Sequence, residues 1–170
     1  MILPSLWQAI EASPFSVYIA ESTWAFPTIE TIHVIALVTV VGTIMIMDLR
    51  LVGVASRDTA VTLMSRDTLP WTWGAFVLAA ITGSLLFASK ATSYMNNPYF
   101  LLKMGCMALA GINMAAFHTT VWKTVTQWDS DCAIPTAGKV AGFLSLFFWF
   151  LVIFFGRAIG FTLGIYGSGS

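Results

Sequence analysis

Four stretches of this chain are long enough and apolar enough to cross a lipid bilayer as helices. They cover roughly residues 28–50, 70–90, 99–122 and 138–163. The hydrocarbon core of a bilayer takes about 20 apolar residues per helix. Only 9% of the residues are charged, whereas a soluble domain carries about a quarter. The sequence therefore predicts an all-α fold, a polytopic membrane protein whose four-transmembrane-helix bundle occupies residues 27–166.

The residues before the first stretch, 1–26, form an amphipathic segment. Apolar side chains alternate there with Gln8, Glu11 and Glu21, which is typical of one or two helices that lie in the membrane interface. The segment lacks the basic start of a signal peptide, so we expect no cleavage. A proline stands at or just before each predicted helix start, where the first turn favours it: Pro27, Pro70, Pro98 and Pro135. Residues 167–170 (GSGS) are expected to be a linker remnant.

Lysine and arginine are distributed unequally between the two ends of the predicted bundle. The loop at one end offers only Lys90, whereas the loops and helix ends at the other hold Arg50, Arg57, Arg66, Lys123 and Lys139. Positive loops stay cytoplasmic, so we expect a bacterial inner (cytoplasmic) membrane protein with both termini in the periplasm. The net charge is zero, which gives no electrostatic case for nucleic acid. The two cysteines, Cys106 and Cys132, do not make a disulfide framework.

Ionisable side chains within a membrane are costly and by default mark a functional site. Several fall at one level near the outer ends of the four predicted helices: Glu30, His33, Lys90, Lys103 and Arg157. A haem needs an axial nitrogen for its iron and cations for its two propionates, and this outer layer contains both. The same set could hold another anion, such as a lipid phosphate. The alternatives are a structural histidine bonded to Glu30, and lysines that extend to the interface.

A second polar layer lies at the inner face, where Asp48, Arg50 and His118 stand. Asp48 and Arg50 are expected to pair with each other or with headgroups. At about 100° per residue, one face of the third helix carries a stripe roughly 80° wide: Lys103, Met107, Ala110, Met114 and His118. Copper favours histidine together with methionine, so this stripe, with Met45 and Met47 of the first helix, predicts copper binding as an alternative. Methionines are more often packing residues.

The two histidines cannot both ligate one haem iron. Lys103 and His118 are 15 residues apart, or about 22 Å along a helix, and His33 lies at the level of Lys103. Axial nitrogens on one iron are about 4 Å apart, since each metal–nitrogen bond is about 2 Å. We therefore expect His33 to be the only histidine that binds iron. The identity of the second axial ligand is not decided by the sequence.

Two helices resemble those of the bacterial four-helix protoporphyrinogen IX oxidases and of the related membrane part of copper-resistance protein D. The likeness rests on residues 32–37 (IHVIAL), Gly42 and residues 49–51 (LRL) in the first helix. In the third helix it rests on residues 99–103 (YFLLK) and 117–118 (FH). The resemblance implies a b-type haem (haem b) with His33 as axial ligand and Lys103 as a functional partner.

The sequence thus favours a membrane haem protein in electron transfer, or a small redox subunit, with haem near the periplasmic face. Its expected partners are the lipid bilayer and a periplasmic redox or copper protein. We expect a homo-oligomer or a subunit of a larger membrane complex. The alternatives are a copper-handling membrane protein, and a non-catalytic assembly or lipid-binding subunit. No catalytic base or nucleophile of a recognisable kind is present, so enzymatic activity stays open.

Overall fold

The computed structural model describes residues 3–130 and 133–167, and every regular element within them is helical. In chain order these elements are α1 (Leu3–Glu11), α2 (Pro14–Glu21), α3 (Ala25–Val52), α4 (Val61–Ser89), α5 (Ala91–Asn96), α6 (Pro98–Thr119), the 3-10 helix η1 (Val121–Gln127) and α7 (Thr136–Gly167). The helices α3, α4, α6 and α7 are long and apolar enough to cross a membrane. The predicted all-α, four-helix membrane fold is therefore confirmed. Cys132 and residues 168–170 lie outside the described residues.

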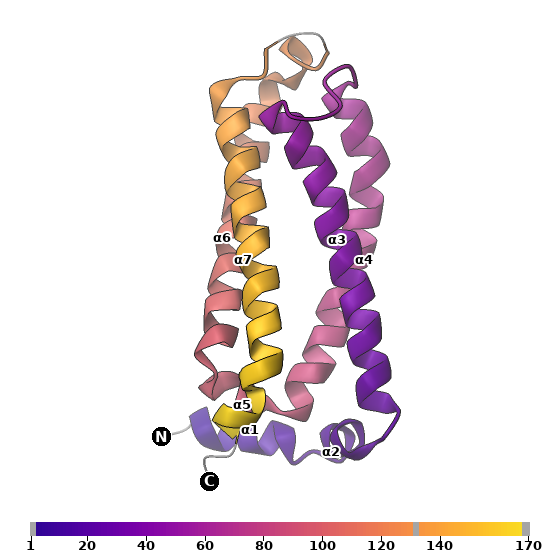
Figure 1. Ribbon diagram of the computed structural model, residues 1–170, viewed down its shortest axis with the longest axis vertical. Coiled ribbons are helices and arrows are strands. Elements are labelled where there is room, and N and C mark those ends of the chain that lie inside the picture. The colour runs from indigo at the N-terminus through magenta and orange to yellow at the C-terminus, as the bar shows by residue number, and fades with distance from the viewer. Residues whose placement is uncertain (1–2, 131–132, 168–170) are drawn as a thin grey trace.

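The four long helices run side by side along the molecule and alternate in direction (Figure 1). We call the end that carries α1, α2 and α5 the terminal end, and the end that carries residues 53–60 and η1 the loop end. Helix α3 packs on α4, α6 packs on α7, and α3 also packs on α7. Helices α4 and α6 share no such extensive contact within the described part of the chain. The bundle is therefore two hairpins joined along α3 and α7, and it is open between α4 and α6.

Helices α3 and α7 approach most closely at Gly142. A Cβ atom on this residue would lie 3.0 Å from Leu51 Cβ and 3.1 Å from the backbone oxygen of Asp48. Small residues let the backbones of membrane helices approach in this way. Gly142 closes a Gly-x-x-x-Gly sequence that begins at Gly138, a pattern typical of close helix packing. A second such sequence runs from Gly156 to Gly160, but a Cβ atom on Gly160 would meet nothing within 4 Å, so no tight crossing occurs there.

We predict that Gly142→Ala destabilises the bundle by about 1–3 kcal/mol, because the added methyl forces two backbones apart. The matched control is Gly160→Ala on the same helix, where a Cβ meets nothing within 4 Å. The measurement is the thermal unfolding of both variants in detergent. Equal melting temperatures for the two variants would contradict the close α3–α7 crossing.

The short helices at the terminal end lie across the bundle rather than along it (Figure 1). Ile19 and Ser16 of α2 are buried. The ring of Trp7 in α1 makes an edge contact with Phe87 of α4 at 5.7 Å, and Glu11 accepts a hydrogen bond from the backbone N–H of Thr92 at 3.2 Å. The amphipathic segment therefore forms two helices, as expected, and packs on α4 and α5. The sequence analysis had not predicted α5.

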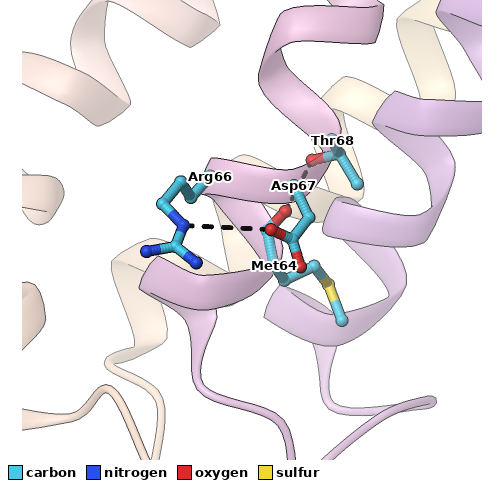
Figure 2. Close-up of polar contacts among 4 residues, drawn as sticks. All are labelled: Met64, Arg66, Asp67 and Thr68. Carbon is cyan, nitrogen blue, oxygen red and sulfur yellow. Dashed lines mark hydrogen bonds and ion pairs between the residues drawn. The ribbon is translucent and has the colours of Figure 1, made fainter.

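Helix α4 begins nine residues before the predicted start, so Pro70 lies inside the helix and not at its start. Figure 2 shows the first turns of α4, where Arg66 Nε lies 3.9 Å from Asp67 Oδ1 and the Thr68 hydroxyl donates to the Met64 carbonyl at 2.9 Å. Arg66 and Asp67 are exposed, with fractions of 81% and 65%. Such a pair contributes little stability. Because of these charged residues, the first turns of α4 do not belong to an apolar run, and a search for apolar runs places the helix start too late.

Asp129, from the loop before α7, caps the start of α4. Its carboxylate accepts hydrogen bonds from the backbone N–H of Thr62 at 2.8 Å and from the Thr62 hydroxyl at 2.6 Å. Its backbone oxygen accepts from the N–H of Val61 at 3.2 Å. The residue before the helix, Ala60, makes no side-chain cap. A side chain distant in sequence therefore satisfies the free N–H groups of this helix start.

Acidification should weaken this cap. The hydrogen bond from Thr62 is the main reason that the pKa of Asp129 lies below its usual value, and the charge of Arg50 adds to it. The cap is fully present above the unfolded pKa of about 4 and is lost as the pH falls through the lower folded pKa. We predict that Asp129→Asn, which does not ionise, flattens the fall in melting temperature below about pH 4. Asp67→Asn is the control, and an unchanged acid profile in Asp129→Asn would contradict the cap.

Candidate functional site

His33 lies half-buried on α3 and faces α4. Its Nδ1 is 2.9 Å from the hydroxyl oxygen of Thr82, and that hydroxyl donates its own hydrogen to the Leu78 carbonyl at 2.7 Å. The Thr82 oxygen therefore accepts, and His33 Nδ1 carries the proton. The Ala79 carbonyl, which also interacts with the imidazole, can only accept as well. A hydrogen bond of this kind fixes the ring and leaves Nε2 with a free lone pair, as in a metal-ligating histidine.

Gly83 of α4 makes room for the His33 ring. A Cβ atom at this position would lie 3.0 Å from His33 Cε1 and 3.6 Å from Nδ1. Real Cβ atoms essentially never come closer than this, so a side chain at 83 would push the ring away. The imidazole is therefore held on one side by the Thr82 hydroxyl and on another by the backbone of α4.

Lys103 of α6 points into the bundle and lies against α7. Its Nζ, Cε and Cδ atoms would be 3.7–4.0 Å from a Cβ atom on Gly156, so the aliphatic chain passes over this glycine. Its charge interacts electrostatically with His33. Within the described residues it forms no ion pair or hydrogen bond with an acceptor. The structure therefore brings an imidazole and an uncompensated cation from opposite hairpins to one level of the bundle.

The other three members of the predicted outer layer lie elsewhere. Arg157 is exposed on α7, with Cζ 4.6 Å from the ring centre of exposed Phe161. Lys90 Nζ lies 5.2 Å from the ring centre of Phe26. Glu30 is exposed and does not bond to His33, whose partner is Thr82. The depth of these residues in the membrane can be read from the sequence but their direction cannot, and their roles toward a cofactor stay predictions. Arg157 follows Gly156, so it points about 100° away from the face that meets Lys103.

The inner layer surrounds a cavity of about 200 Å³ near the loop end. Met47, Met107, Met114 and His118, all predicted metal ligands, lie in its wall, whereas Met45 is exposed elsewhere. His118 Nδ1 lies 2.9 Å from the Met114 carbonyl, which leaves Nε2 free. Within the described residues no group of three or more His, Cys, Asp and Glu is placed to hold a metal ion. His118 contacts Trp122 of η1 at 5.6 Å, at the end away from His33, so the two histidines are separated as expected.

Asp48 and Arg50 are both buried but do not pair, which corrects the sequence expectation. Arg50 donates from Nε to the Thr59 carbonyl at 2.8 Å and from a terminal nitrogen to the Asp129 carbonyl at 3.4 Å. Asp48 lies in the cavity wall, where Ser145 of α7 hydrogen-bonds its carboxyl group. Its Oδ2 atom has no hydrogen-bond partner. Arg50 thus connects the loop before α4 to the loop before α7, and Asp48 faces the cavity.

Comparison with models of protein families assigns the chain to a family. A family model matches residues 11–162, from the end of α1 to near the end of α7. The chain belongs to DUF6644, a family of unknown function. No curated protein and no solved structure matches it. The DUF6644 match includes both the His33–Lys103 pair and the cavity around Asp48, since all of these residues fall within residues 11–162.

The sequence analysis missed the residues that support the site. Thr82 and Gly83 orient His33, and Ser145 bonds Asp48. All three are small residues in apolar helices, and a polar residue buried in a membrane is a usable signal. That signal was present for Thr82 and Ser145, but the helix that each one faces cannot be decided from sequence alone.

Proposed function

We propose that this DUF6644 protein is a membrane b-type haem protein that acts in electron transfer, with His33 as an axial ligand. One observation carries the proposal: Thr82 leaves His33 Nε2 unprotonated beside an uncompensated cation, Lys103. A neutral imidazole nitrogen suits haem iron, and a lysine suits a propionate. The resemblance of the first and third helices to haem-containing membrane oxidases points the same way.

The residues present fit one axial bond and one propionate. His33 supplies the nitrogen and Lys103 the cation, while Arg157 and Lys90 lie against the rings of Phe161 and Phe26. When bound, haem iron supplies a reversible one-electron change. The chain's own contribution is to orient the imidazole through Thr82 and to raise the reduction potential through the charge of Lys103.

An absorbance spectrum of the purified protein, produced in a haem-sufficient host, tests the proposal. We expect a Soret band, with sharp α and β bands after reduction. Copper without haem would favour the second candidate, and neither cofactor would favour a non-catalytic assembly or lipid-binding subunit. A haem-free protein that also fails to take up added haem would rule the proposal out.

The second candidate is copper handling, and one observation favours it. His118, Met47, Met107 and Met114, predicted separately from two helices, all line the same cavity. Copper binds histidine together with methionine. Metal analysis after dialysis against Cu(I) decides the matter, with His118→Ala expected to lower the copper content if this interpretation is right.

We also propose that the terminal end faces the periplasm of a bacterial inner membrane. The excess of lysine and arginine at the loop end supports this orientation. An impermeant thiol reagent added outside intact cells should therefore fail to label Cys132, which follows η1 in sequence, and should label it after lysis. Rapid labelling in intact cells would reverse the orientation and place the His33 level at the cytoplasmic side.

A further inference from the structure

The cavity near the loop end is lined by both α4 and α6, two helices that contact each other only sparsely. Its wall includes Trp73 and Phe76 of α4 and Met114 of α6, which are 50%, 37% and 45% exposed. These residues lie within the apolar spans of α4 and α6. In a bilayer the opening therefore faces lipid, and a ligand that dissolves in the membrane reaches the cavity sideways.

Among the described residues of this wall, Asp48 is the one with a fully buried side-chain oxygen that has no hydrogen-bond partner. It is only 6% exposed, and its Oδ2 has no partner. Thr72, by contrast, donates to the Thr43 hydroxyl at 2.8 Å, and Asn113 donates to the Ala141 carbonyl at 2.9 Å. A buried carboxyl group is costly in its charged form unless it is paired with a cation, so a positive ligand would stabilise the ionised form of Asp48.

The protein offers no such cation itself. None of the described residues that line the cavity is a lysine or an arginine. Arg50, two residues from Asp48, is already bonded to the Thr59 and Asp129 carbonyls. A permanent positive charge beside this carboxyl group would therefore have to come from a ligand.

The rest of the wall is mostly apolar and rich in aromatic rings. Trp149 is buried at the cavity, and Trp73, Phe76, Phe117 and Trp122 complete the aromatic lining. Aromatic faces attract organic cations, and they do so most strongly where water is excluded. A bare Ca²⁺ or Mg²⁺ would instead need six or more oxygen ligands, which this wall does not provide. The lining thus suits an organic cation better than a metal ion.

We propose that this cavity binds a hydrophobic organic cation from the membrane, with its ammonium group on Asp48 and its apolar body among the aromatic rings. Asp48 supplies the charge, Ser145 holds the carboxyl group in place, and Trp149 and Trp73 surround the ligand. This site is separate from the His33–Lys103 pair and does not depend on haem.

Isothermal titration of the purified full-length protein in detergent tests the proposal with two probes. Benzyltrimethylammonium carries a permanent charge and an aromatic ring, and 2,2-dimethylpropylbenzene is its neutral isostere. We expect the cation to bind at least about ten-fold more tightly than the isostere, since cation–π and carboxylate contacts supply free energy of at least that order. Equal affinity for both probes, or no binding of the cation, would overturn the proposal.

Two pairs of variants locate the binding. Asp48→Asn keeps the shape and removes the charge, and its control is Asp67→Asn, an exposed carboxylate on α4. Gly111→Leu fills the cavity while leaving Asp48 intact, and its control is Gly105→Leu on the same helix, which has nothing within 4 Å and does not line the cavity. We expect at least about ten-fold weaker binding of the cation in the first member of each pair only.

Gly111→Leu keeps the proposal testable even where Asp48→Asn fails to fold. Binding that survives in Asp48→Asn or in Gly111→Leu would place the cation elsewhere and overturn the proposal. Cu(I) that binds the wild-type protein through His118 and excludes benzyltrimethylammonium would also overturn it, and would assign the cavity to copper. Loss of binding in both variants with retention in both controls supports it.

Discussion

Replacing His33 with alanine is expected to remove haem completely, whereas His118→Ala should retain most of it. His33 Nε2 is an imidazole nitrogen without a partner on the level of Lys103, whereas His118 lines the cavity near the loop end beside Trp122. The measurement is the Soret absorbance per protein, after purification of both variants in parallel. Loss of the Soret band in His118→Ala alone would reverse the assignment of the two histidines.

The groups that orient His33 allow a finer test. Thr82→Val keeps the shape of the side chain and removes its hydroxyl, and loss of such a supporting hydrogen bond weakens metal binding by about 10–100-fold. Gly83→Ala places a methyl group 3.0 Å from His33 Cε1, whereas its control, Gly74→Ala on the same helix, meets nothing within 4 Å. We expect an altered spectrum in Thr82→Val and Gly83→Ala and a normal one in Gly74→Ala.

Lys103→Met is expected to cause the second large loss. Methionine keeps most of the side-chain volume but leaves a bound propionate without its cation, and breaking a buried ion pair costs about 3–5 kcal/mol. Haem should be lost during purification, or its midpoint potential should fall, because a nearby positive charge favours the reduced iron. Redox titration of the retained haem measures this effect.

Lys103→Arg separates charge from shape, since arginine keeps the charge and changes the donor geometry. We expect partial retention of haem in this variant. If Lys103 only extends toward the interface, Lys103→Met should instead be as stable as the wild type, with normal haem content and potential. That result would leave His33 as the sole supported member of the site.

The sequence was sufficient for the fold because the bilayer imposes a simple rule of length and apolarity. All four predicted spans correspond to long helices. The start of α4 was missed because it is set by Asp129, which is 67 residues away from Thr62 in the chain. A search for apolar runs detects the part of a helix that lies in lipid and not the turns that extend beyond it.

For the candidate site, the depth of each residue in the membrane was predictable from the sequence, but the direction in which each side chain points was not. Helical rise gives the depth of each ionisable residue, so His33 and Lys103 were placed correctly at one level. Which side chains face each other depends on the rotation of each helix about its axis, and that rotation is set by contacts such as Gly142 on Leu51. Arg157 shared the level of the pair but faces away from it.

The two hairpins of the bundle each contribute one member of the His33–Lys103 pair. His33 and Thr82 belong to the hairpin of α3 and α4, whereas Lys103 and Gly156 belong to that of α6 and α7. Any molecule that changed the angle between these hairpins would therefore also change the separation of His33 from Lys103. A coupling of this kind would have the same free energy in both directions.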